Sequence, residues 1–232
     1  MIAAAFETST RSASVALAIG DDFADAGRLE FVVGALDGAA AHASDLLPRL
    51  AEMLGERGLQ ASDLDAVLVG LGPGSYTGLR VSVATALGLA LGKVDRRTPQ
   101  LLGVPSCEAL LGGSLAEGER GAWIQDARSG GFYTASGRMT GNFELQTQPA
   151  VVDQAGLEHF LSEQTGARLL GDEATAKTLE RIGVAANLEF VTPTAQHVLQ
   201  LGLPRLARDG GTAPAQLAPL YLRPFAVKVR KR

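Results

Sequence analysis

The sequence predicts an α/β protein made of two related lobes, and three observations support this prediction. Short apolar runs typical of strands alternate with segments whose apolar residues recur at helical spacing. The order in the first half, strands followed by a helix and a strand, recurs more weakly in the second half. The 232 residues suffice for one large or two small domains. We expect one lobe over residues 1–104 and another over 105–232, each a mixed sheet with helices, and the last segment could pack back on the first lobe.

The first half contains three strand-like runs before its first helix. The expected elements are strands at 2–6, 12–19 and 28–36, a helix at 44–58, a strand at 64–72 and a second helix that follows a turn at 72–75. In the first helix, four leucines and a methionine between positions 46 and 54 share one face. Ser44 can cap that helix, Pro48 suits its first turn, and Gly58 can end it.

The second half repeats this kind of order with weaker signals. The expected elements are two strands joined by a glycine turn over 121–137, a strand at 143–152, a helix at 154–166, a strand and turn at 167–174, and helices at 175–183 and 194–210. The boundary between the halves falls near residues 98–106.

Composition and charge are ordinary for a soluble globular protein, with 46% hydrophobic and 20% charged residues. The net charge of −4 excludes an overall basic field for nucleic acid. The C-terminus is a basic tail whose cations are Lys228, Arg230, Lys231 and Arg232. Such a tail is either a solvated end or a local RNA contact. One cysteine permits no intrachain disulfide, and neither a signal peptide nor a membrane span is indicated, so we expect a cytoplasmic protein.

Residues 70–92, GLGPGSYTGLRVSVATALGLALG, combine a glycine-rich turn with an apolar segment of small side chains. No lysine follows the glycines, as a Walker loop requires, and Thr77 stands where the dinucleotide fingerprint needs its third glycine. What remains is a helix N-terminus that Ser75 or Thr77 can cap and that could hold an anion. Glycine costs about 1 kcal/mol inside a helix, so Gly88 indicates a close packing partner, internal or external.

Two polar turns are candidate sites for a nucleotide or a phosphate. The candidate residues are Glu7, Thr8, Ser9, Thr10, Asp126 and Arg128. Hydroxyl and N–H groups in the turn between the first two strands can hold a phosphate, and the second turn could line a cleft between the lobes. An ordinary polar hairpin and a capped turn with a surface salt bridge explain the same residues.

Metal and nucleophilic chemistry have no supporting motif. His42, His159 and His197 are far apart in sequence and form no pair at helical spacing, and a cysteine pair is lacking. Ser75 lies outside a Gly-x-Ser-x-Gly elbow, and Cys107 has no nearby basic partner. We therefore expect neither a catalytic residue nor a resident metal in this chain.

Five segments occur in an order that resembles the bacterial TsaB (YeaZ) family over nearly the whole chain. They are FETSTRSASVAL, HASDLLPRL, GLGPGSYTGLRVSVATALGLALG, DARSGGFYTA and PLYLRP, and the Gly-Pro-Gly-Ser-Tyr-Thr-Gly-Leu-Arg block is the most specific. The resemblance implies the two-lobed fold of actin, Hsp70 and sugar kinases (ASKHA). It also implies a non-catalytic subunit that binds and activates TsaD. That partner carries a metal and transfers threonylcarbamoyl to the adenosine next to the anticodon, position 37, of tRNAs reading ANN codons.

The resemblance further implies an ATPase partner, TsaE, and contact with tRNA through the complex. Three positions depart from the patterns of relatives. Glu7 stands where sugar kinases and actin usually have Asp, and Ala43 where the family commonly has a hydroxyl residue. The histidine pair that holds the metal in TsaD is represented only by His42. The changes at Glu7 and Ala43 weaken a self-sufficient nucleotide site, and the single histidine indicates the non-catalytic relative of TsaD.

The resemblance and the small-residue helix together predict a partner interface on the helices that begin at Ser44 and Ser75. The predicted interface residues are His42, Leu46, Leu50, Tyr76, Gly78, Leu79, Ser82, Val83 and Ala86. Alone, the chain would bury this face in a homodimer. We expect no required cofactor, with ATP or ADP bound weakly or only in the complex. The alternatives are an ATP-binding phosphotransferase of the same fold and a metallopeptidase-like (glycoprotease) protein.

Overall fold

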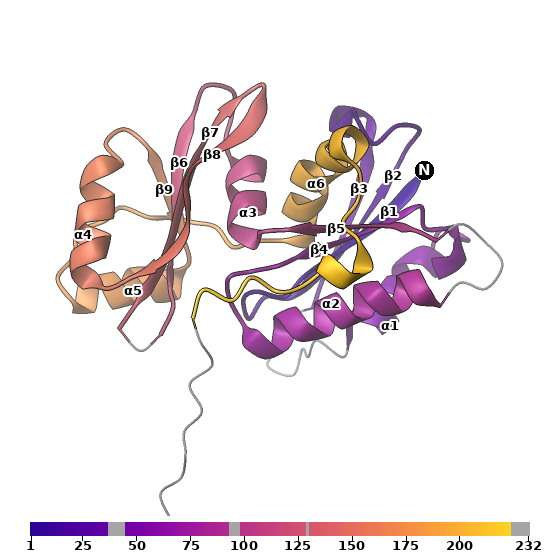
Figure 1. Cartoon of the computed structure of the whole chain (residues 1–232), viewed down its shortest axis with the longest axis horizontal. Helices are drawn as coiled ribbons and strands as arrows, with labels where there is room; N and C mark the ends of the chain where they lie inside the picture. Colours follow the sequence, from indigo (N-terminus) through magenta and orange to yellow (C-terminus); the bar gives the residue numbers. More distant parts are fainter. Residues whose placement is uncertain (37–44, 93–97, 129, 224–232) are drawn as a thin grey trace, which may run out of the picture.

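Two five-stranded sheets stand side by side with helices around and between them, as the computed structural model shows (Figure 1). The structure describes residues 1–36, 45–92, 98–128 and 130–223. The predicted two-lobed α/β fold is confirmed.

The first sheet is mixed and has the strand order β3-β2-β1-β4-β5. Its strands are β1 (Ile2–Glu7), β2 (Ser14–Ile19), β3 (Glu30–Ala35), β4 (Ala66–Gly70) and β5 (Gln100–Val104). The first three run antiparallel, and β4 and β5 run parallel to β1. Because β1 and β4 are central and buried on both faces, they consist almost entirely of apolar residues.

The second sheet repeats this topology with the order β10-β9-β6-β7-β8. Its strands are β6 (Arg120–Asp126), β7 (Phe132–Thr140), β8 (Asn142–Val152), β9 (Arg168–Gly171) and β10 (Glu189–Phe190). Again three antiparallel strands come first, and the last two run parallel to the first. The recurrence of one strand order in both sheets explains the weak repetition that the sequence shows.

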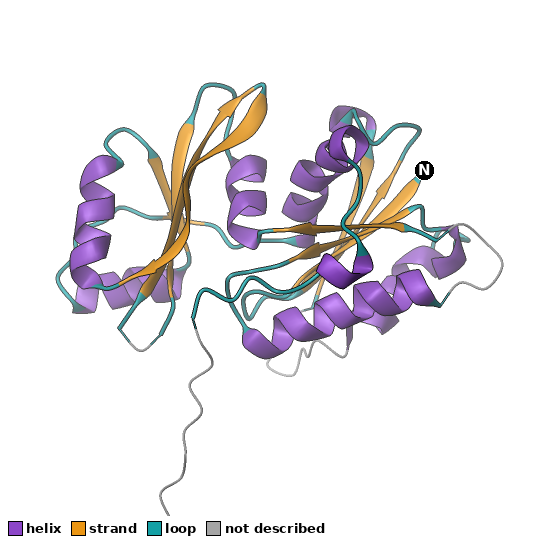
Figure 2. Ribbon diagram, in the orientation of Figure 1, coloured by secondary structure: helices purple, strands orange, loops and turns teal. Residues whose placement is uncertain are grey.

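The helices form three layers (Figure 2). The α-helices are α1 (Leu46–Gly55), α2 (Tyr76–Leu91), α3 (Ser106–Ser114), α4 (Gln154–Glu163), α5 (Glu173–Arg181) and α6 (Ala195–Asp209), and 3-10 turns lie at Ala26–Arg28, Ala61–Asp63 and Pro214–Gln216. Helices α1 and α2 share a core with one face of the first sheet, and α4 and α5 with one face of the second. Helices α3 and α6 lie between the two sheets.

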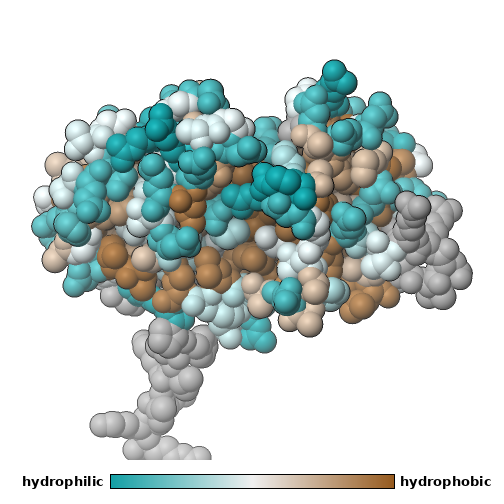
Figure 3. All heavy atoms as spheres, turned by 45° about the horizontal axis from the view of Figure 1, so that its top comes forward, coloured by the Kyte–Doolittle hydropathy of each residue, from teal (hydrophilic) through white to brown (hydrophobic). Residues whose placement is uncertain are grey.

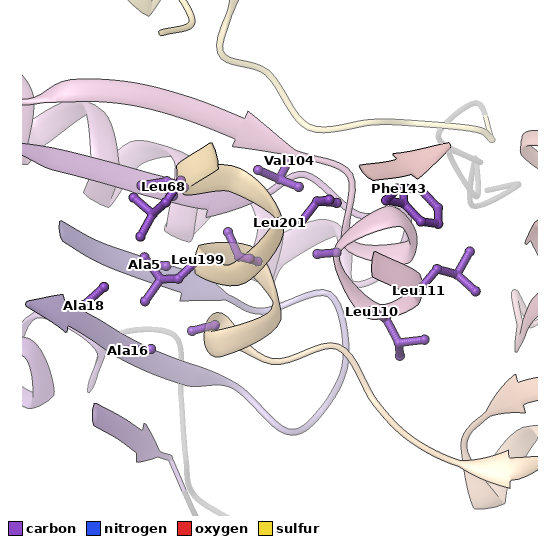
Figure 4. Packing of buried hydrophobic residues seen from close by; sticks show 14 of the residues in the cluster. Ala5, Ala16, Ala18, Leu68, Val104, Leu110, Leu111, Phe143, Leu199 and Leu201 are labelled. Atoms are coloured by element: carbon purple, nitrogen blue, oxygen red, sulfur yellow. The ribbon is translucent and has the colours of Figure 1, made fainter. Parts of the chain in front are cut away.

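The central core joins the two lobes through α3 and α6 (Figure 4). Helix α6 follows the second sheet in the chain but packs on β1 and β2 of the first, and Leu199 and Ala5 belong to the same core. Helix α3 follows the first sheet but packs on β7 and β8 of the second. Leu201 of α6 closely approaches Gly112 of α3, which brings the two helices into close contact.

The sequence missed β5 and α3, which lie in and just after the segment read as a boundary. Strand β5 is only five residues long, and α3 is apolar over much of its surface because sheets and α6 enclose it. The two glycines of α3 also weaken its helical signal, but they allow close packing, since a Cβ at Gly113 would press on the His197 ring. Tertiary contacts stabilise this helix against its local preference.

Helix α1 differs slightly from its predicted bounds. It begins at Leu46 with Asp45 at the N-cap position, and Ser44, the predicted cap, lies outside the described residues. Pro48 falls in the first turn, as expected. The helix ends at Gly55, and the turn that follows closes at Gly58, whose φ of 65° favours glycine. None of the helices in the described ranges has the length and apolarity needed to cross a bilayer.

Candidate functional site

The glycine loop before α2 closes tightly over the turn between β1 and β2. A Cβ at Gly74 would overlap the Ser9 carbonyl, and one at Gly78 would overlap the carbonyl of Thr8. The Ser75 N–H donates a 2.7 Å hydrogen bond to the Ser9 carbonyl, and the Ser75 side chain caps α2 by accepting from the Gly78 N–H. These glycines are therefore needed for close internal packing.

Glu7 is sealed at the end of β1, with no exposed surface. Its Oε1 accepts from the Ser9 N–H at 2.6 Å, and its Oε2 is buried where a Cβ at Gly70 would overlap it. Burial raises the pKa of this carboxyl, and hydrogen bonding to Ser9 opposes the rise only in part. A buried and readily protonated carboxyl is poorly suited to hold the magnesium ion of a nucleotide.

The hydroxyl groups beside Glu7 make hydrogen bonds within the first lobe. Thr8 donates to the Ser82 hydroxyl at 3.0 Å, and Ser82 donates to the Leu79 carbonyl in α2. The Ser9 side chain is buried, and Thr10 accepts from the Ser12 N–H at 3.2 Å. This loop joins β1 to β2 and supports the start of α2.

In the second lobe, Asp126 is the last residue of β6 and Arg128 lies in the turn that joins β6 to β7. Asp126 accepts from the Arg128 N–H at 2.7 Å and from the Thr178 hydroxyl at 2.9 Å. The φ of Arg128 is 61°, a left-handed conformation that this bonding helps to hold. Within the described ranges, no hydrogen bond or ion pair joins this turn to the loop at Glu7–Thr10, so the structure does not link the two predicted phosphate groups directly.

Most of the predicted interface residues lie inside the first lobe, which corrects the expectation that their side chains form an exposed surface. The buried ones are Leu46, Leu50, Gly78, Leu79, Ser82, Val83 and Ala86. The apolar faces of α1 and α2 pack on the first sheet, so the strongest apolar signal in each helix marks the core. Tyr76 is exposed, and His42 lies outside the described residues.

The opposite face of α2 is open and forms a shallow groove with α1. The groove has a volume of about 780 Å³, and its lining residues are Leu47, Tyr76, Thr77, Arg80, Val81, Ala84, Thr85, Gly88 and Leu89. Leu47 is 46% exposed although it is a large apolar residue. A Cβ at Gly88 would meet nothing within 4 Å, so internal packing does not account for this glycine.

Tyr76 at the rim of the groove has partners that the sequence did not indicate. Its ring centroid lies 5.1 Å from that of Tyr221, and the Arg80 guanidinium lies 5.3 Å from the Tyr76 centroid. Tyr221 comes from the C-terminal segment, which local spacing could not place beside α2. Leu47 had a sequence signal, since it lies in the apolar series of α1, but that series did not distinguish the exposed leucine from the buried ones.

The described histidines have other roles. His159 is exposed and lies 3.6 Å from Glu163, and His197 helps to cap α6 by accepting from the Thr194 N–H. Among the residues that the structure describes, no three His, Cys, Asp or Glu side chains gather closely enough to hold a metal ion. Burial raises the pKa of the Cys107 thiol, which opposes formation of a nucleophilic thiolate.

Two sheets of equal strand order, with the helices α3 and α6 between them, define a two-lobed α/β protein of the ASKHA type. Solved structures agree. The structure titled YeaZ from Pseudomonas aeruginosa superposes with a TM-score of 0.72 at 27% identity, covering 95% of this chain and 99% of that one. A second structure is titled an uncharacterized protein with similarity to peptidase YEAZ from the same organism. It superposes with a TM-score of 0.74 at 27% identity, covering 96% of this chain and 99% of that one.

Sequence comparisons narrow the class to a family. The family model described as TsaD, tRNA N6-adenosine threonylcarbamoyltransferase, matches residues 37–203. The TsaB protein of Escherichia coli K12 is 26% identical over 78% of this chain and 80% of its own length. TsaB of Haemophilus influenzae is 36% identical over 38% of this chain and 34% of its own length. The chain belongs to this family, and within it to the TsaB (YeaZ) proteins of tRNA threonylcarbamoyladenosine biosynthesis.

Proposed function

We propose that this chain is a non-catalytic assembly subunit that binds and activates a TsaD-like catalytic subunit. The complex would threonylcarbamoylate N6 of the adenosine next to the anticodon, position 37, in tRNAs that read ANN codons. The observation that carries the proposal is the open face of α2, where Gly88 and Ala84 leave a groove beside the exposed Leu47.

This groove suits the approach of a helix from another protein. Small residues at Ala84 and Gly88, one helical turn apart, allow a partner helix to come close to the α2 backbone. Leu47 from α1 supplies apolar area at one side, and Arg80 supplies a charge near Tyr76. Interface cores combine apolar anchors with aromatic and arginine side chains in this way. Two helices from each partner would form a four-helix contact.

The burial and hydrogen bonding of the side chains considered for catalysis or nucleotide binding support a non-catalytic role. Glu7 is buried, the Thr8 hydroxyl donates to Ser82 of α2, and the Cys107 thiol is disfavoured as a thiolate. The chain would require no cofactor, and ATP or ADP would bind weakly or only within the complex. Isothermal titration with Mg-ATP tests this part, since a Kd below about 10 μM, or about −7 kcal/mol, would favour a phosphotransferase instead.

The remaining partners belong to the same proposal. A TsaE-like ATPase would join the complex, tRNA would be met through it, and the chain would act in the cytoplasm. Alone, the chain would cover the groove by forming a homodimer, because an exposed apolar surface favours self-association. The basic tail from Lys228 to Arg232 is a candidate RNA contact, and deletion of these residues without loss of modification would remove it.

Co-purification from the native cell tests the proposed partner. Tagged wild-type chain should bring down a TsaD-like protein at equal stoichiometry, and Leu47→Asp should lose it because the substitution places a charge in the groove. Phe190→Asp is the matched control, since Phe190 is 63% exposed on β10 in the second lobe. Equal recovery with wild type and Leu47→Asp would contradict the proposed docking face.

A further inference from the structure

The segment that follows α6 returns along the first lobe toward the second (Figure 1). The Thr212 N–H donates to the Leu101 carbonyl of β5 at 2.6 Å. Leu217 is buried in the core that α1 and α2 share with the first sheet, and the Leu220 N–H donates to the Leu71 carbonyl at 2.8 Å. Side-chain burial and backbone bonding thus fix this segment to the first lobe.

The end of this segment reaches both the groove and the second lobe. The Tyr221 ring packs against the ring of Tyr76 in the first turn of α2, with an angle of 31° between the two planes. Two residues later, Arg223 donates to the Arg128 carbonyl at 2.8 Å and to the Ala127 carbonyl at 3.3 Å. We call residues 217–223 the strap.

The strap fits the second-lobe turn closely. Gly131 leaves the space that the Arg223 guanidinium fills, because a Cβ at Gly131 would overlap Arg223 Nη2. The carbonyls that accept from Arg223 belong to the turn in which Arg128 has a positive φ. A charged donor that satisfies two turn carbonyls is among the stronger hydrogen-bonding arrangements in proteins.

We propose that the strap couples the open face of α2 to the arrangement of the two lobes. The lobes are joined through the α3–α6 core, and the strap is a second connection, from α2 to the turn between β6 and β7. Two separate connections restrict rotation of one lobe against the other more than one does. A partner that contacts Tyr76 and Arg80 would then respond to the state of the second lobe. Only this last step rests on the proposed function.

Hydrogen exchange measured by NMR on the full chain tests the coupling without any partner. Coupling is reciprocal, so each end of the strap should affect the other. Tyr221→Ala should raise exchange several-fold at the Arg128 and Gly131 N–H groups, which Tyr221 is not seen to contact. Arg223→Ala should do the same at the Gly78 and Leu79 N–H groups in the first turn of α2.

Two substitutions at exposed residues in the second lobe serve as controls. Phe190→Ala is the control for Tyr221→Ala, and Arg181→Ala is the control for Arg223→Ala. Neither should change exchange at either end of the strap. Exchange that rises only at the end next to each strap substitution would overturn the proposal, because the strap would then be two independent contacts.

Binding to a purified TsaD-like subunit separates this proposal from the proposed function. Arg223 lies outside the groove, yet Arg223→Ala should weaken binding at least about fivefold if the partner senses the coupling. Unchanged affinity for this variant would overturn the partner step. Unchanged affinity for Leu47→Asp would instead overturn the docking face, while reciprocal exchange effects in the free chain would still support the strap.

Discussion

Glu7 is the residue whose chemistry departs most from its sequence reading. As a polar residue in a turn, it resembled a magnesium or phosphate ligand. The structure buries it against Gly70 and Ser9, because glycines at the end of β4, in the loop that follows it and in the first turn of α2 allow close approach to the Glu7–Ser9 segment. The sequence could reveal the turn and its hydroxyls, but the burial depends on contacts between residues more than 60 positions apart.

Glu7→Gln should stabilise the protein at neutral pH. Burial raises the folded-state pKa of Glu7 above its ordinary value of 4.5. The protonated side chain therefore contributes its full share to folding stability below about pH 4.5. The contribution is lost as the pH rises through the folded-state pKa. The free energy of unfolding of the variant should therefore exceed that of wild type by about 1 kcal/mol or more at pH 8, and by little at pH 4. Denaturant unfolding of both proteins at the two pH values measures the difference. A larger gain at pH 4 would contradict the assigned burial.

His197 should give the opposite pH dependence. Burial lowers its pKa below 6.5, so the neutral ring is favoured in the folded state, and stability falls as the pH drops through this range. The neutral ring also accepts from the Thr194 N–H at the start of α6. His197→Asn should lower the free energy of unfolding by about 1 kcal/mol at pH 8, because the substitution alters the cap of α6. Between pH 7 and 5, the free energy of unfolding should depend less on pH in this variant than in wild type. If the stability of the variant depended on pH as steeply as that of wild type, His197 would not be the source of this dependence.

Helix α2 shows at the scale of one element what spacing could and could not predict. Its existence, its cap at Ser75 and its small residues were readable from the sequence. Its orientation was not, because apolar residues occur on both faces and periodicity alone cannot choose between them. The groove residues Ala84 and Gly88 were distinguished from the buried Gly78 and Ala86 only by the position of the first sheet.

Two glycines in α2 should respond in opposite directions to alanine. Gly88→Ala adds a methyl group in open space and improves helix propensity, so it should stabilise the chain by up to about 1 kcal/mol. Gly78→Ala should destabilise it by about 2 kcal/mol, because the new Cβ would overlap the Thr8 carbonyl. Thermal unfolding of the two variants beside wild type measures both effects. Equal shifts would contradict the assigned faces of the helix.

The whole molecule has the predicted two lobes, and both sheets have one strand order. The sequence raised the possibility that the last segment packs back on the first lobe, but it did not indicate which elements would make that contact. Helix α3 follows the first sheet but packs on the second, helix α6 follows the second sheet but packs on the first, and the C-terminal strap ends on the turn at Arg128. Such exchanges leave no local pattern, since each helix has the same apolar residues whichever sheet it contacts. Polar residues cover much of the face in Figure 3, with hydrophobic ones gathered along its lower edge.

The most direct test of the central claim is a titration of Gly88→Leu against a purified TsaD-like subunit. Leucine is a better helix former than glycine, and the site has open space, so the variant should fold at least as well as wild type. Its side chain would fill the groove, and we predict that the Kd rises at least about tenfold, equivalent to about 1.4 kcal/mol. Phe190→Leu should bind as wild type does. A Gly88→Leu variant that binds with unchanged Kd would contradict the assignment of this face as the docking surface.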